Sequence, residues 1–206
     1  MSIVKLNNNG VKNATAFGSI TGLGSMTFIK KLTASSSSTL SFVDGASSVV
    51  LDNTYKEYIF TFKNLHLSSN TASIFFNGSI DGGSNYNVTK TTTNFEANHN
   101  EADSASTLTY KTARDLAQST SDQILANEPG NDNDQCMSGY MHLFNPSSTT
   151  FVKHFITNLN STYHGDYTVN VFIGGYFNTT SAIDAITFKP DSGTIDAGDI
   201  CLYGIA

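Results

Sequence analysis

Histidines and carboxylates are the side chains of this 206-residue chain that could transfer protons or bind a metal ion. The five histidines are spread along the sequence, and none stands in an H-E-x-x-H motif: His66, His99, His142, His154 and His164. Two of them, His142 and His154, belong to one predicted hairpin but fall on its opposite faces, so we do not expect them to share a metal ion. The sequence therefore predicts ordinary strand and surface histidines, and no metal site.

Three carboxylates, Glu96, Glu101 and Asp103, are close enough in sequence to suggest the catalytic pair of a glycan-degrading enzyme. Nothing in the sequence fixes their separation, which decides whether such a pair can act. Asp132 and Asp134 have the i, i+2 spacing of some calcium loops but lack the following glycine and the distal glutamate of an EF-hand. The sequence also lacks a nucleophile elbow and a phosphate-binding loop. We predict a protein that is not an enzyme and uses no cofactor, and we leave calcium binding at Asp132 and Asp134 open.

The charge balance narrows the range of partners. The chain has 11 Lys and Arg against 17 Asp and Glu, a net charge of −6, and Arg114 is its single arginine. Nucleic-acid binding needs clustered positive side chains, so we expect no nucleic-acid partner. No stretch approaches the roughly 18 apolar residues of a membrane span, and the first residues lack the apolar run of a signal peptide. We expect no membrane partner and a cytoplasmic site of synthesis, where Cys136 and Cys201 stay reduced.

Alternating aromatic residues indicate that the chain forms β-strands. The clearest case is 55–65, where Tyr58, Phe60 and Phe62 fall on one face. Similar patterns separated by turn signals predict strands or strand pairs at 26–33, 39–44, 47–51, 72–80, 139–156, 167–177, 182–190 and 199–206. About eight to ten short strands of this kind predict an all-β fold: an antiparallel β-sandwich, with a jelly roll as the favoured form.

We divide the chain into an N-terminal arm or docking strand at 1–24 and a single β-sandwich domain at 25–206. Residues 94–135 lack clear periodicity, so we expect a long polar insertion there, with a weak helix over 112–127 as one interpretation. The side chains of this insertion with the most contact area or charge are the candidate partner-binding residues: Phe95, His99, Tyr110 and Arg114. The aromatic alternation predicts a core between the two sheets, formed by Phe42, Tyr58, Phe60, Phe62, Leu143, Ile186, Phe188 and Leu202.

The predicted hairpin at 139–156 has apolar side chains on both faces. A turn at 146–149 places five residues on one face: Met141, Leu143, Val152, His154 and Ile156. The opposite face then holds Tyr140, His142, Phe144, Phe151, Lys153 and Phe155. A sheet with two apolar faces needs two covering layers, the second from its own chain or from another subunit. We take the second set as a candidate subunit interface and expect a homo-oligomer.

Three blocks of the sequence resemble, in matching order, a group of proteins encoded by marine tailed phages, cyanophages among them. The blocks are 32–65, 138–156 and 174–206, about half of the chain. Their most specific parts are the turn sequence at 144–150, the strand entry at 178–188 and the ending "SGTIDAGDICLYGIA". The resemblance implies a virion structural protein with a jelly-roll fold, tail-fibre-like or capsid-associated and packed around a threefold axis. It supplies no catalytic motif.

We therefore expect a virion protein, assembled in the host cytoplasm and exposed on the particle as a tail- or fibre-associated module or as head decoration. Its expected partners are other virion proteins and further copies of itself, with a trimer favoured. The alternative is a carbohydrate-binding module that recognises a host-surface glycan, because jelly rolls also host sugar sites. The chain has no Trp, which argues against sugar binding as its sole role.

Overall fold

The structure, a computed structural model, describes residues 26–206, and these form twelve strands with no helix among them. The arm predicted at 1–24 lies outside the described residues. The strands are β1 (Met26–Thr33), β2 (Leu40–Val43), β3 (Glu57–Leu67), β4 (Ile74–Ser79), β5 (Lys90–Asn100), β6 (Ser106–Tyr110), β7 (Gln123–Ala126), β8 (Met137–Phe144), β9 (Lys153–Tyr163), β10 (Tyr167–Phe177), β11 (Ala185–Pro190) and β12 (Ile195–Ile205).

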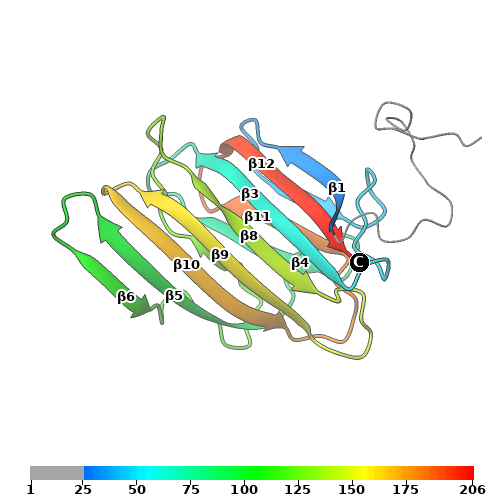
Figure 1. Cartoon of the computed structure of the whole chain (residues 1–206). Helices are drawn as coiled ribbons and strands as arrows, with labels where there is room; N and C mark the ends of the chain where they lie inside the picture. Colours follow the sequence, from blue (N-terminus) through cyan, green and yellow to red (C-terminus); the bar gives the residue numbers. More distant parts are fainter. Residues whose placement is uncertain (1–25) are drawn as a thin grey trace, which may run out of the picture.

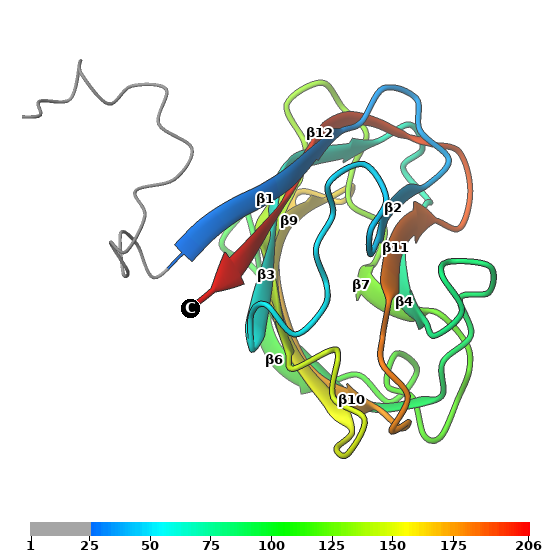
Figure 2. The same ribbon diagram turned by 90° about the vertical axis from the view of Figure 1, so that its right-hand side faces the viewer.

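The strands form two antiparallel sheets that face one another, so the prediction of a β-sandwich is confirmed (Figures 1 and 2). The large sheet has eight strands in the order β1-β12-β3-β8-β9-β10-β5-β6. The small sheet has four strands in the order β2-β11-β4-β7. Figure 2 shows the small sheet as a second layer opposite the curved large sheet. Each strand of the large sheet therefore has an inner face toward the small sheet and an outer face away from it.

Four strands at one end of the large sheet come from two separate segments of the chain. β5 and β6 lie between β4 and β7 in sequence, and β9 and β10 lie between β8 and β11. The two segments join because β10 pairs with β5 along all 11 residues of each strand. We call these four strands, β9, β10, β5 and β6, the extension. They continue the large sheet beyond β8 (Figure 1).

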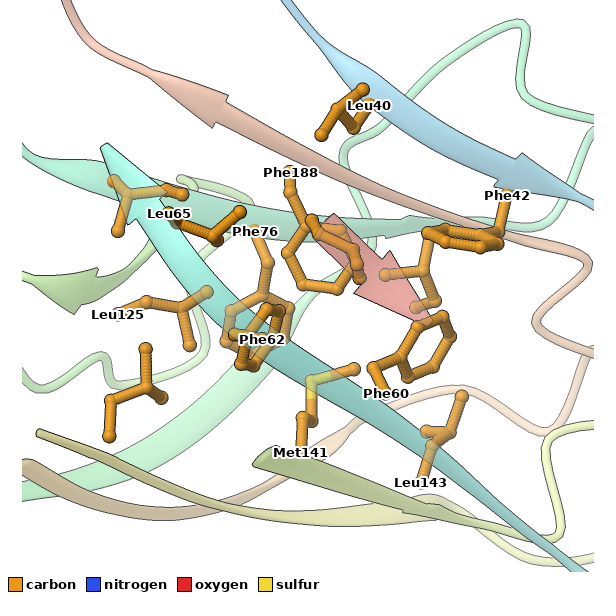
Figure 3. Close-up of a cluster of buried hydrophobic side chains, with 14 of the residues drawn as sticks. Leu40, Phe42, Phe60, Phe62, Leu65, Phe76, Leu125, Met141, Leu143 and Phe188 are labelled. Atoms are coloured by element: carbon orange, nitrogen blue, oxygen red, sulfur yellow. The ribbon is translucent and has the colours of Figure 1, made fainter. Parts of the chain in front are cut away.

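An aromatic cluster fills the space between the sheets (Figure 3). Phe60 of β3 packs edge-to-face on Phe42 of β2, with ring centroids 5.3 Å apart, and on Phe188 of β11 at 5.5 Å. Phe62 contacts Phe188 in the same way at 5.2 Å. All eight residues predicted for the core are buried, which confirms that prediction: Phe42, Tyr58, Phe60, Phe62, Leu143, Ile186, Phe188 and Leu202. Period-two alternation found them because each strand covers an apolar layer.

The register of the predicted hairpin at 139–156 is wrong. Leu143 of β8 pairs with Phe155 of β9, so the connection spans residues 145–152 instead of a tight turn at 146–149. The shift is odd, and an odd shift reverses the faces of β9 relative to β8. Lys153 and Phe155 are buried on the inner face, whereas His154 and Ile156 point outward.

The connection between β8 and β9 is held by its own hydrogen bonds. The Ser148 amide donates to the Asn145 carbonyl, and the Ile183 amide donates to the Pro146 carbonyl. These bonds fix a wider loop than the alternation of side chains could indicate.

The segment 94–135 is also different from the prediction. It contains the second half of β5, all of β6 and all of β7, so it contributes to both sheets, and 112–127 is not helical. Leu125 and Ala126 of β7 belong to the hydrophobic core. The strand predicted at 47–51 is absent as well; this segment is a loop that buries Val49 and Leu51. The segment 94–135 therefore forms strands of both sheets and part of the core, and is not a polar loop on the surface of the sandwich.

Candidate functional site

Most of the large apolar side chains exposed in residues 26–206 lie on the outer face of the large sheet. They are Met26, Phe28, Phe95, Leu108, Tyr110, Tyr140, Ile156 and Phe172. The other two exposed large apolar residues of this range, Ile80 and Phe151, lie in loops. Uncharged polar side chains such as Asn158 and Asn170 lie between them, so this face combines exposed large apolar residues with uncharged polar ones, as protein–protein contact surfaces do.

A row of aromatic side chains crosses the outer face of the extension. Tyr110 of β6 pairs with Phe95 of β5, which pairs with Phe172 of β10. The Phe95 and Phe172 rings are stacked, with centroids 5.0 Å apart and an angle of 7° between their planes. The row continues through Asn158 of β9 to Tyr140 of β8. Five neighbouring strands thus present one continuous contact surface.

The structure divides the residues predicted for a subunit interface into three groups. Tyr140, His142 and Phe144 lie on the outer face, with the ring centroids of Tyr140 and His142 5.1 Å apart. Phe151 is exposed in the loop between β8 and β9. The remaining two predicted residues are buried and cannot contact a subunit: Lys153 donates to the Thr179 carbonyl at 3.0 Å, and Phe155 packs in the core.

The two histidines expected on opposite faces of the hairpin share the outer face. His142 pairs with the carboxylate of Glu57, and the ring of His154 lies 5.8 Å from that of Tyr176. Within the described part of the chain, no group of three or more His, Cys, Asp and Glu side chains could hold a metal ion. Asp132 and Asp134 belong to no such group.

The four residues predicted to bind a partner separate onto the two faces of the extension. Phe95 and Tyr110 are on the outer face, where the Tyr110 hydroxyl also donates to Asp115 at 2.7 Å. His99, near the end of β5, is exposed and forms an ion pair with Asp103 at 3.2 Å. Arg114 lies on the inner side, where a polar cleft opens.

The cleft is built around the buried carboxylate of Glu96 on β5. Only 4% of its side chain is exposed, and it lies between two cations that keep about a quarter of theirs exposed. Lys111 Nζ is 3.2 Å from Glu96 Oε2, and Arg114 Nη1 donates to Glu96 Oε1. A buried carboxylate needs such partners because burial removes its hydration. Glu101 and Asp103, the other members of the imagined catalytic set, are exposed beyond the end of β5.

The turn after β6 places the two cations by backbone hydrogen bonds. The Lys111 amide donates to the Asn94 carbonyl of β5 at 2.8 Å, and the Arg114 amide donates to the Lys111 carbonyl at 3.0 Å. The buried Gln123 side chain donates to the Arg114 carbonyl at 2.9 Å and accepts from Thr92 of β5. Both ends of the turn are therefore fixed to β5, and Lys111 and Arg114 both point toward Glu96.

Two tyrosines from the tight β9–β10 connection form another wall of the cleft. The rings of Tyr163 and Tyr167 are 6.1 Å apart in an edge-to-face arrangement. The Tyr163 hydroxyl donates to Glu128 Oε2 at 3.2 Å. Burial, together with the nearby Glu128 carboxylate, raises the pKa of the Tyr163 hydroxyl. Tyr163 therefore keeps its proton and remains a hydrogen-bond donor at neutral pH.

Three cavities meet at Tyr163. The first, about 390 Å³, holds the Glu96 cluster, Tyr167, Asn98 and Asn127. The second, about 610 Å³, shares Arg114, Asn127 and Tyr163 with it. The third, about 210 Å³, shares Tyr163 and Tyr167 with the first and is lined by four acidic residues: Glu101, Asp132, Asp134 and Asp166. The second cavity also has three carboxylates, those of Asp115, Asp122 and Glu128, so cations outnumber carboxylates only in the first cavity.

The sequence pointed to Arg114 as a partner-binding residue and to Glu96 as a member of an imagined carboxylate pair, and among the acidic residues of the third cavity it had singled out Glu101, Asp132 and Asp134. It missed Lys111, which stands three positions before Arg114 in a turn, a spacing that places both side chains on one side. It also missed Tyr163 and Tyr167, which flank the tight H-G-D connection. This connection could have indicated that the two tyrosines lie side by side, because residues at the two ends of a tight hairpin pair with each other.

No helix in the described residues is long and apolar enough to cross a membrane. Comparisons of the chain with models of known protein families, with curated proteins and with solved structures find no match.

Proposed function

We propose that this chain is a structural protein of a tailed-phage particle that packs in symmetric copies on the particle surface. The observation that supports the proposal best is the set of eight large apolar side chains exposed on the outer face of the large sheet. Aromatic and aliphatic side chains gathered on one exposed face are typical of protein–protein contact surfaces. The resemblance to tailed-phage virion proteins suggests the particle, on its tail, on a fibre or on its head.

The chemistry of the outer face favours a second copy of this chain as the covering surface. The outward positions of β8, β9, β10, β5 and β6 contain no Asp, Glu, Lys or Arg in these described strands. The centres of protein interfaces are depleted of charge and enriched in Tyr and Phe. A face with so few charged side chains can pack on another copy with little like-charge repulsion, and in a trimer one part of the face would contact a different part on the next copy.

The strand order supports a jelly roll with two insertions as the underlying fold. Without the extension, the sheets read β1-β12-β3-β8 and β2-β11-β4-β7. In chain order, the eight strands then alternate between the sheets except at β4 and β7, which are both in the small sheet. Two interleaved Greek keys of this kind define the eight-stranded jelly roll of viral capsid and lectin domains.

The assembly is tested by measuring the mass of the full chain in solution by light scattering at micromolar concentration. We expect a trimer, the symmetry that the resemblance favours. Phe172→Asp should give monomers because it places a charge in the centre of the outer face. Phe151→Asp changes an exposed phenylalanine of the loop between β8 and β9 and should leave the trimer intact.

A monomeric parent chain with no neighbour along the outer face in the particle would overturn the assembly proposal. The virion role has its own test, mass spectrometry of purified virions. Absence of the chain from the particles would overturn that role.

A second function, carbohydrate binding, is favoured by the cleft in the extension. Binding sites combine an apolar or aromatic wall with a few converging polar groups, as Tyr163 and Tyr167 do with Asn98 and Asn127. Titration with oligosaccharides tests this function separately from assembly.

A further inference from the structure

We infer that the cleft binds an acidic oligosaccharide, with the carboxylate of one sugar unit at Arg114 and Lys111 and neighbouring rings against Tyr163 and Tyr167. This inference rests on the second proposed function, carbohydrate binding, and adds the charge and the direction of the ligand. It does not depend on whether the chain forms an oligomer.

The charges of the Glu96 cluster leave one cation in excess. Lys111 and Arg114 are two of only 11 basic residues in a chain with a net charge of −6, and Glu96 neutralises one of them. A guanidinium has five N–H donors, and within residues 26–206 the Arg114 side chain donates to Glu96 alone. The remaining N–H donors of the Arg114 guanidinium suit a second carboxylate, because guanidinium groups bind carboxylates through two parallel hydrogen bonds.

The exposure of the three side chains indicates which of them a ligand can reach. Glu96 is almost completely covered, whereas 26% of the Lys111 side chain and 23% of the Arg114 side chain remain exposed. Both cations line the cavity of about 390 Å³. If these cations served only to neutralise Glu96, they would not need to face an open cavity. Their exposure instead favours a second anion that comes from outside.

The tyrosines and amides suit the uncharged parts of a sugar. The faces of the Tyr163 and Tyr167 rings can pack on the apolar C–H face of a pyranose. The Asn98 and Asn127 side chains offer both donors and acceptors for hydroxyl groups. A cavity lined by both aromatic rings and side-chain amides is therefore suited to a polyhydroxylated ring.

The three cavities at Tyr163 indicate a ligand of several units and set its direction. Each of the two larger cavities falls within the range of about 300–1,000 Å³ that is usual for small-molecule sites. The third cavity is lined by four acidic residues, and the second has the carboxylates of Asp115, Asp122 and Glu128 beside Arg114; both sets would repel a sugar carboxylate. The acidic unit therefore lies in the first cavity, between Lys111 and Arg114, and only neutral units can extend from it into the other two.

The test is isothermal titration calorimetry of the full chain with tetragalacturonic acid and tetrasialic acid, each compared with its methyl ester. The ester keeps the sugar and removes the charge. We expect at least one acid to bind at least 10-fold more tightly than its ester. Equal binding of acid and ester would overturn this inference and leave carbohydrate binding in place. Absence of binding by all four compounds would overturn both.

Substitutions then locate the site. Arg114→Gln and Lys111→Gln should each weaken binding of the acid at least 10-fold, whereas Lys31→Gln, which removes an exposed cation of β1, should not. Glu96→Gln should strengthen binding of the acid, because it frees both cations. Tyr167→Ala should weaken binding of acid and ester alike, with Tyr140→Ala on the outer face as its control. Thermal unfolding of every variant separates lost binding from lost folding, and unchanged binding by folded Arg114→Gln and Lys111→Gln variants would overturn the inference.

Discussion

Strands β3 and β5 belong to the same sheet and have the same length of 11 residues, but their inner faces differ in chemistry. β3 buries Tyr58, Phe60 and Phe62 against the small sheet. β5 buries four polar residues instead: Lys90, Thr92, Asn94 and Glu96. The apolar face of β3 supports the sandwich, and the polar face of β5 lies beneath the turn that forms the cleft. One sheet thus combines a region whose inner face is an apolar core with a region whose inner face is polar and borders a cleft.

The difference arises from what covers each strand. The rings of Phe42 and Phe188 from the small sheet pack on β3, so its burial is apolar. The turn after β6 and the side chain of Gln123 cover β5 with polar groups, so Thr92 and Glu96 find partners there, whereas the buried side-chain amide of Asn94 has none. The Thr92 hydroxyl donates to Gln123 and accepts from the Leu116 amide.

The largest effect is expected from one ring on the inner face of β3. Phe60→Ala should lower the free energy of unfolding by about 3–5 kcal/mol, because it leaves a cavity in the aromatic cluster. In the dissociated chain, Phe95→Ala, which removes a ring on the outer face of β5 that is 39% exposed, should cost about 1 kcal/mol or less. Urea unfolding of both variants at nanomolar concentration measures the contrast, and equal costs would show that the outer face of β5 is packed as closely as the inner face of β3.

A second pair of variants asks whether residues 94–135 belong to the core. Leu125→Ala of β7 should lower the free energy of unfolding by about 2–5 kcal/mol, because Leu125 is fully buried. In the dissociated chain, at nanomolar concentration, Leu108→Ala of β6 should change it by about 0.5 kcal/mol at most, because Leu108 is 76% exposed. A negligible cost for Leu125→Ala would indicate that this segment lies on the surface and does not belong to the core.

The buried lysine of β5, Lys90, should make the free energy of unfolding depend on pH. Burial lowers the pKa of Lys90 from its ordinary value of 10.5 to about 8, although the nearby Asp122 carboxylate acts in the opposite direction. Between pH 8 and 10.5, Lys90 is therefore protonated in the unfolded chain and largely deprotonated in the folded one. The free energy of unfolding therefore gains a contribution that rises with pH in this window, by up to about 3 kcal/mol.

Lys90→Met removes this contribution, so urea unfolding from pH 7 to 10 should show a parent curve that rises relative to the variant. The comparison stops at pH 10 because burial raises the pKa of Tyr58 to about 12, which lowers stability above that pH. Parallel curves for the parent chain and Lys90→Met would mean that Lys90 is not a desolvated charge.

The smallest effect is expected at an exposed ion pair between β1 and β12, at the end of the large sheet that lies away from the extension. Lys31 lies 3.3 Å from Asp199, and 49% of its side chain is exposed. Lys31→Ala should cost less than about 1 kcal/mol, and high salt should reduce that cost further. A larger cost at 1 M salt would show that this pair matters more than its exposure indicates.

The sequence predicted the part of the fold in which burial and hydrophobicity alternate together. β3, β4, β10 and β11 were recognised because their buried faces are apolar. β5 has the same alternation of burial, but the buried positions hold Lys90, Thr92, Asn94 and Glu96, so no hydrophobic period appears. The register of β8 and β9 was missed because the loop at 145–152 makes backbone contacts that side-chain patterns do not encode.

The cleft was harder to predict because its parts are distant in sequence. Glu96 and Tyr163 approach one another only because β10 pairs with β5 across a long separation. Arg114 was named for its charge alone, and its partner Glu96 for its carboxylate alone. Without the pairing of the strands, nothing in the sequence joins the two residues.

The assembly of copies through the outer face is the central claim, and hydroxyl-radical footprinting of the full chain tests it most directly. Side chains are labelled at micromolar concentration and again after dilution to nanomolar concentration. Assembly predicts that Tyr140, Ile156 and Phe172 are labelled more slowly at micromolar concentration, while Phe151 in its loop is labelled equally at both. Equal labelling of Ile156 and Phe172 at the two concentrations, in a sample whose mass is that of a monomer, would contradict the claim.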